Sequence, residues 1–105
     1  EEHRGLYYLA ELDQRVVGQL LITTEWSDWR NGWFGWIQSV YVEESARRKG
    51  VFRMLYDHVA TLARQRQDVI GLRMYVERDN RRAQTTYASL GMQMTDYYIM
   101  ERHPL

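Results

Sequence analysis

The chain has 105 residues, which is the size of one small domain, and we expect a single domain over residues 1–105. Its 14 basic and 14 acidic residues cancel, which argues against a generally basic, nucleic-acid-binding surface. The sequence contains no cysteine, which excludes disulfides, thiolate metal sites and thiol nucleophiles. We expect no metal site and a cytoplasmic location. No apolar run approaches the ~18 residues of a membrane span, so no membrane partner is expected.

The first half of the sequence predicts three strands. Residues 6–13 mix aromatic and apolar side chains, and residues 15–26 are rich in strand-forming types, with Gly18 as a possible bulge. A short polar turn separates these two runs, which predicts a hairpin. Residues 27–32 then carry loop chemistry that includes an Asn-Gly pair, and residues 33–44 predict the third strand.

The hydrophobic pattern changes its period after Gly50. Apolar residues recur at helical spacing from Val51 onward, which predicts a helix over residues 51–66. Residues 68–77 predict a fourth strand. A strand, a helix and a strand in this order are expected to form a right-handed parallel crossover.

The last third of the chain predicts a short helix and a final strand. Asp79 or Asn80 is the expected N-cap of this helix, and Gly91 is its expected C-terminal stop. Residues 92–102 are predicted to form the last strand. The expected fold class is therefore α/β (α+β), a mixed sheet flanked by helices in the order β-β-β-α-β-α-β.

Three cations and a glycine stand directly before the predicted long helix. The free N–H groups and the dipole at the start of a helix attract anions, and Gly50 lets the backbone approach a phosphate without a Cβ in the way. The spacing alone fits a solvated basic turn as well as an anion cradle. The phosphate-loop pattern G-x-x-x-x-G-K-S/T and the dinucleotide pattern G-x-G-x-x-G are both absent. The expected cradle residues are Arg47, Arg48, Lys49, Gly50, Val51, Phe52 and Arg53.

A second motif lies downstream, where Asn80, Ala83, Tyr87, Gly91 and Met92 recur at fixed spacing. Together with the loop at residues 47–52, it resembles the GCN5-related N-acetyltransferase (GNAT) family. The later family pattern N-x-x-A-x-x-x-Y-x-x-x-G-F/M is matched at every position. The loop pattern Q/R-x-x-G-x-G/A is matched except at its last position, which is Phe52 here.

The resemblance covers about residues 6–102 and implies a GNAT-like fold without the family's usual N-terminal strand and helices. It implies an acetyl-CoA-dependent N-acetyltransferase whose acceptor is a primary amine of a small molecule or peptide. A homodimer is a further expectation, because it would cover the exposed edge of a shortened sheet. The cofactor contacts that the resemblance implies are Val40, Tyr41 and Val42 for the pantetheine arm, the loop from Arg47 to Arg53 for the pyrophosphate, and Asn80, Ala83 and Tyr87.

The catalytic roles follow from the same resemblance. It implies that Tyr87 lies near the sulfur, where its phenol would protonate the leaving thiolate. A packed aromatic residue on the inner face of its helix is the alternative. Histone-modifying members place a general base at the position that is Trp36 here. Glu25 and Asp28 therefore remain as the residues expected to deprotonate or select the amine. A solvated turn without a catalytic role is one alternative for both, and a base that acts through water is another.

All four tryptophans lie within residues 26–36 and are expected either to box a cationic amine or to cover the core. Two other functions stay open, a CoA-binding module without catalysis and a basic-patch domain that binds nucleic acid or a partner. The cations concentrate in one short loop, whereas a nucleic-acid surface spreads them over a face. This placement argues against the nucleic-acid interpretation, and the family resemblance makes the enzyme the preferred interpretation of the other two.

Overall fold

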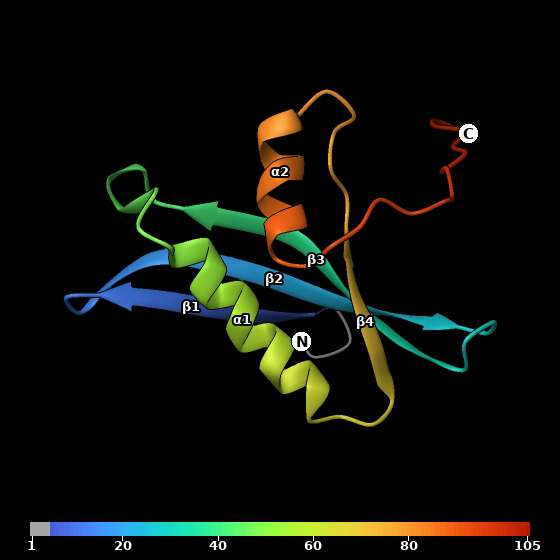
Figure 1. The fold of residues 1–105 in the computed structure, drawn as a ribbon, viewed down its shortest axis with the longest axis horizontal. Coiled ribbons are helices and arrows are strands. Elements are labelled where there is room, and N and C mark those ends of the chain that lie inside the picture. Colours follow the sequence, from blue (N-terminus) through green and yellow to red (C-terminus); the bar gives the residue numbers. More distant parts are fainter. Residues whose placement is uncertain (1–4) are drawn as a thin grey trace. The chain divides into compact units, whose positions relative to one another are not determined.

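The structure, a computed structural model, describes residues 5–105, so residues 1–4 of the expected domain lie outside the described part. The described chain divides into two compact units, with the boundary between Tyr75 and Val76. The first unit contains a β-sheet and a long helix, and the second contains a short helix and the C-terminal segment (Figure 1).

The sheet of the first unit has four strands in the order β1-β2-β3-β4. The strands are β1 (Leu6–Leu12), β2 (Arg15–Ser27), β3 (Gly32–Val42) and β4 (Val69–Met74). The first three pair antiparallel, whereas β4 runs parallel to β3 after the helix α1 (Val51–Arg64). The predicted mixed sheet, the β1–β2 hairpin and the parallel pairing of the strands before and after α1 are therefore confirmed. The helix α1 ends at Arg64, two residues before the predicted Arg66.

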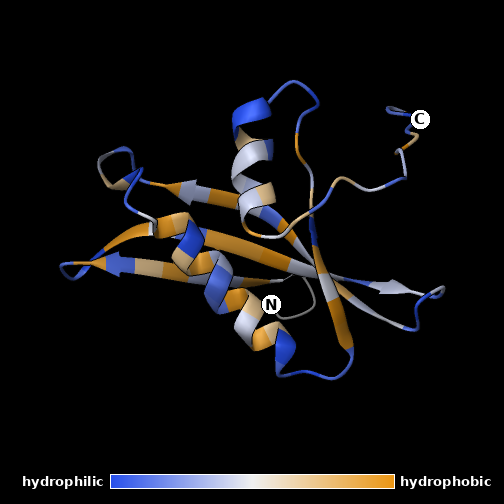
Figure 2. Cartoon of the chain, viewed as in Figure 1, coloured by the Kyte–Doolittle hydropathy of each residue, from blue (hydrophilic) through white to orange (hydrophobic). Residues whose placement is uncertain are grey.

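The core lies between α1 and the sheet, where the apolar stripe of the helix meets the hydrophobic run along β2 (Figure 2). Leu20 of β2 and Val51 of α1 are buried there. A Cβ on Gly18 would lie 2.8 Å from the Val51 side chain, so glycine permits this close approach. The predicted bulge occurs one residue earlier, because Ala10 pairs with Gly18 whereas Glu11 pairs with Val16.

The helix α2 (Arg81–Ser89) of the second unit has both of the predicted end signals. Asn80 is the N-cap, since its side-chain oxygen accepts a hydrogen bond from the Ala83 amide at 3.1 Å. Gly91 follows the helix with a left-handed φ of 96°, and the Met92 amide donates to the Tyr87 carbonyl at 3.2 Å. This is the Schellman arrangement, which explains why the helix stops at a glycine.

The prediction of a last strand over residues 92–102 is wrong, because no strand forms there. Strand propensity becomes a strand only when neighbouring strands offer hydrogen bonds and packing. Tyr98 and Met100 are instead 91% and 96% exposed, and the Thr95 hydroxyl bonds locally to the Tyr97 backbone in a turn. The fourth strand is also shorter than predicted, at Val69–Met74 instead of residues 68–77.

Candidate functional site

The loop before α1 has the geometry of a backbone cradle. The short 3-10 helix η2 (Glu44–Ala46) follows β3. Beyond it, Arg48 and Gly50 adopt left-handed backbone conformations, with φ of 65° and 80° respectively. Gly50 is the N-cap of α1, and a Cβ added there would meet nothing within 4 Å. Glycine is therefore needed for its backbone conformation, and the space outside the helix start is open to a ligand.

The cations of the loop have different surroundings. Arg47 folds back onto β3, where its Nε donates to the Val42 carbonyl at 2.9 Å and its guanidinium lies 6.0 Å from the centre of the Tyr41 ring. Arg53 lies 3.8 Å from Asp57, one helical turn away. Arg47 thus ties the loop to the end of β3, and the exposed side chains of Arg48 and Lys49 carry positive charge beside the helix start.

Phe52 occupies the position where the loop departs from the pattern Q/R-x-x-G-x-G/A. Its ring centre lies 6.2 Å from that of Tyr56, four residues further along α1. A pair at this spacing packs along the helix surface. The bulky side chain is accommodated on the helix itself, and the backbone donors of the first turn do not depend on it.

One edge of β3 opens toward this loop. Its parallel pairing with β4 ends at Ile37 and Met74, whereas its pairing with β2 continues to Val42 (Figure 1). Within residues 5–105, no strand pairs with the β4-side edge of residues 38–42. These five residues span roughly 16 Å at the usual strand rise, and an extended ligand can add to such an edge. Val40, Tyr41 and Val42, predicted to bind the pantetheine arm, lie on this edge.

Glu25 lies beside the point where β3 and β4 separate. Its Oε1 accepts from the Trp36 indole Nε1 at 2.9 Å and from Arg73 Nη1 at 3.2 Å. The Arg73 guanidinium also lies 3.7 Å from the centre of the buried Phe34 ring, which is a cation–π contact. Trp36 stacks in turn on Tyr75, with 4.7 Å between the ring centres.

Asp28 lies elsewhere, in the turn between β2 and β3, where its Oδ1 accepts from the Trp26 indole at 2.7 Å. Trp26 packs edge-on against Trp33 at 5.2 Å. Side chains alternate between the faces of a strand, so Trp33 and Trp36 project from opposite faces of β3. The structure therefore does not bring Glu25 and Asp28 together.

The four tryptophans do not form one box either. Trp29 is 97% exposed at the hairpin turn, and the other three divide between the two faces.

In the second unit, Ala83, Tyr87 and Leu90 are all half-buried and lie along one side of the helix and its C-cap. Burial removes water from the Tyr87 phenol and raises its pKa above the ordinary value for tyrosine. The phenol therefore stays protonated at neutral pH. Asn80 uses its side-chain oxygen to cap the helix, which gives the first position of the second motif a structural role.

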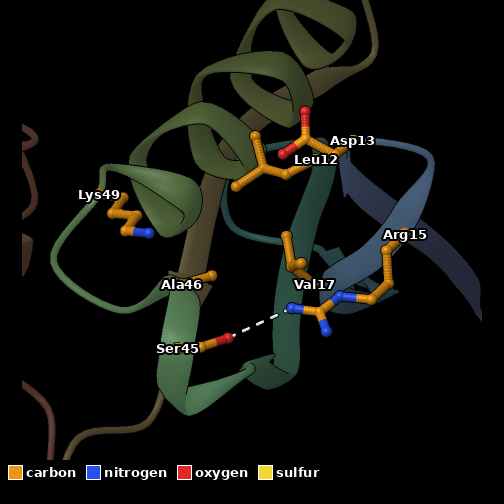
Figure 3. A pocket seen from close by; sticks show the side chains of 7 residues that line it. All are labelled: Leu12, Asp13, Arg15, Val17, Ser45, Ala46 and Lys49. Carbon is orange, nitrogen blue, oxygen red and sulfur yellow. Dashed lines mark hydrogen bonds between the residues drawn. The ribbon is translucent and has the colours of Figure 1, made fainter.

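A cavity of about 290 Å³ lies on the hairpin side of the loop (Figure 3). Arg15 reaches across it to Ser45 Oγ at 3.3 Å and to Glu43 at 3.3 Å, which fixes η2 to the β1–β2 hairpin. The cavity is lined by Leu12, Asp13, Arg15, Val17, Ser45, Ala46 and Lys49. Arg15 and Lys49 outnumber Asp13 in this lining, but Arg15 is already paired with Glu43, so the cavity offers no strong preference for an anion.

Sequence reasoning did not identify this cavity, nor Arg73 and Tyr75. The one available signal was an arginine inside the otherwise apolar run of β4. Among residues 5–105, no cluster of three or more His, Asp or Glu side chains is arranged to hold a metal ion. Neither helix of this part combines the length and the hydropathy that a membrane span requires.

A family model described as "Acetyltransferase (GNAT) family" matches residues 1–92. A possible acetyltransferase from Clostridium difficile 630 is 42% identical, with a TM-score of 0.91, over 100% of this chain and 69% of that one. An integron cassette protein from V. cholerae is 26% identical, with a TM-score of 0.79, over 97% of this chain and 65% of that one. A search of curated proteins finds no match.

A more distant structure, Arabidopsis thaliana Naa50 in complex with the bisubstrate analogue CoA-Ac-MVNAL, shares the fold at 21% identity and a TM-score of 0.73. The match covers 93% of this chain and 66% of that one. The chain thus spans about two thirds of the length of these structures.

Proposed function

Because the chain belongs to the acetyltransferase (GNAT) family, we propose that it transfers an acetyl group from acetyl-CoA to a primary amine of a small molecule or peptide. The observation that carries this proposal is the unpaired edge of β3, which leads from the β3–β4 separation to the Gly50 loop at the start of α1. An extended arm that ends in a pyrophosphate matches both features. The complex of Naa50 with a CoA-peptide analogue supports a cofactor and acceptor of this kind.

The residues of the first unit fit acetyl-CoA in two ways. Residues 38–42 offer strand-type hydrogen bonding to the pantetheine amides, with Val40, Tyr41 and Val42 as the contacts that we propose. The helix start at residues 50–53, with Arg48 and Lys49 beside it, offers backbone donors and positive charge to the pyrophosphate. Arg47 acts by holding the loop against β3. We propose Asn80 and Ala83 as further contacts on the strength of the second motif.

Acetyl-CoA supplies a thioester carbon that is open to attack by an amine. An ammonium acceptor must first lose a proton, and the nitrogen–carbon bond then forms as the carbon–sulfur bond breaks. The second proton that the nitrogen loses on becoming an amide balances the proton that the thiolate gains. We propose that Glu25 or Asp28 accepts the amine proton or selects the amine, and that Tyr87 donates a proton to the departing thiolate. Glu25 has the stronger support, because it lies beside the β3–β4 separation, whereas Asp28 lies at the far end of β3.

A cytoplasmic location belongs to the same proposal, because acetyl-CoA is made and used inside cells. A homodimer is proposed on the exposed edge of β1, where Leu6, Tyr7 and Leu9 are 49%, 62% and 58% exposed. Sedimentation velocity of the purified protein should give twice the mass of the chain, and a monomer at all concentrations would contradict this part.

Neutralising the carboxylates should separate their roles. Glu25→Gln keeps an oxygen acceptor for the Trp36 indole but removes the negative charge, so KM for the amine should rise by about 2- to 30-fold, or the pH profile of kcat/KM should shift. The affinity for CoA should not change. Initial rates across pH with the best amine from a broad panel measure this.

Asp28→Asn is the matched variant, since it removes the same charge from the other face of the hairpin. If both variants have the same KM for the amine and the same pH profile of kcat/KM as the parent, neither carboxylate is the base. The proposed function itself is tested by mass spectrometry of the panel reactions, in which an N-acetylated amine must accumulate.

A further inference from the structure

The Trp36–Tyr75 pair stands at the end of the unpaired β3 edge. Trp36 is followed by Ile37, the last residue of β3 that pairs with β4, and Tyr75 directly follows the last residue of β4. The two rings stack at 4.7 Å between their centres with 34° between their planes. Trp36 is half-buried and Tyr75 is 62% exposed, so Trp36 is packed against the protein whereas much of the Tyr75 ring is accessible to a ligand.

The position of this pair follows from the alternation of the strands. Gly18 of β2 faces α1, and Glu25 lies an odd number of residues further along, so it projects from the opposite face. The Trp36 indole bonds to Glu25 and lies on the same face. A pantetheine arm that runs along residues 38–42 from the Gly50 loop would reach the point where β3 and β4 separate, next to Trp36 and Tyr75.

The charges around the pair are balanced. Glu25 carries one negative charge and Arg73, at 3.2 Å, one positive charge. A strongly negative pocket would hold an amine as its ammonium form, which cannot attack a carbonyl carbon. The Arg73 charge offsets part of this effect, and the aromatic surface then adds attraction for the body of the acceptor.

We infer that Trp36 and Tyr75 form the acceptor-binding wall of the site, and that the preferred acceptor is a primary amine carried on a flat aromatic or apolar body. This inference rests on the proposed acetyl transfer and names its substrate class. Trp36 is positioned by its bond to Glu25, whereas the exposed Tyr75 ring contacts the acceptor and determines specificity.

The test compares two amines with and without an aromatic body, 2-phenylethylamine and n-butylamine. Tyr75→Ala should raise KM for 2-phenylethylamine by about 3- to 10-fold, the range expected for one aromatic contact, and leave KM for n-butylamine unchanged. Tyr75→Phe should behave as the parent, because the ring and not the hydroxyl makes the contact. Trp29→Ala removes an exposed indole from the turn between β2 and β3 and should change neither KM.

Equal effects of Tyr75→Ala on both amines, or no effect on either, would overturn the inference while leaving acetyl transfer intact. A calorimetric titration of 2-phenylethylamine into the CoA-bound protein gives a second readout that does not need turnover. The parent should bind the amine 3- to 10-fold more tightly than Tyr75→Ala, about the same ratio as in KM. Equal affinity of the parent and of Tyr75→Ala for 2-phenylethylamine would contradict the role of Tyr75 in binding the acceptor. Failure of the parent to bind CoA would contradict the proposed function instead.

Discussion

Replacing Tyr87 by phenylalanine should lower kcat by about 10- to 1,000-fold and leave the affinity for CoA nearly unchanged, near the contribution of one positioned acid. The phenylalanine ring keeps the half-buried packing on α2 and removes only the hydroxyl. Steady-state rates with saturating amine, together with a CoA titration, measure the two quantities. Equal losses in kcat and in CoA affinity would instead indicate a packing role.

The pH dependence gives an independent check on the same residue. The acid is the protonated phenol, and burial raises the pKa of Tyr87 above its usual value of about 10. The proton is therefore retained at neutral pH, and the midpoint of any fall in kcat from its loss should lie above about pH 10. An alkaline limb near pH 8 that disappears in Tyr87→Phe would contradict this account.

Gly50→Asp should weaken CoA binding at least tenfold, or about 1.4 kcal/mol, because it places a carboxylate at the helix start that is proposed to hold the pyrophosphate. The position itself is accessible, since a Cβ there meets nothing within 4 Å, but the left-handed φ of 80° strains most side chains. Calorimetric titration with CoA measures the loss.

Gly50→Asn is the matched control, since asparagine has the same shape as aspartate, tolerates the left-handed conformation and carries no charge. The difference between the Asp and Asn variants isolates the electrostatic part, which should shrink as salt is added. A folded Gly50→Asp variant that binds CoA as tightly as Gly50→Asn would refute the loop as the pyrophosphate site.

The sequence predicted the parts of the fold that depend on local signals. Asn80 and Gly91 were identified as helix-end residues because capping requires particular side chains at particular positions, and the structure confirms both. The spacing of the apolar residues distinguished β2 and β3 from α1, because strands and helices expose one face with different periods. The family match and the related structures confirm the predicted GNAT family, the fold class and an acyltransferase.

The remaining features depend on contacts between distant residues, which no local pattern encodes. Residues 92–102 have strand propensity, but without a pairing partner they form no strand. The tryptophans lie close together in sequence, but the packing of Trp26 on Trp33 and of Trp36 on Tyr75 depends on how the strands pair. Arg73 contacts Glu25 across 48 positions of sequence, so the pairing of the Glu25 charge could not be predicted.

The most direct test of the central claim is the release of free thiol from acetyl-CoA by the purified protein, measured with and without a primary amine. The account predicts thiol release that rises with amine concentration to saturation and that falls sharply in Tyr87→Phe. Tight CoA binding with no amine-dependent thiol release across a broad amine panel would contradict it, and would leave a CoA-binding module in place of an acetyltransferase.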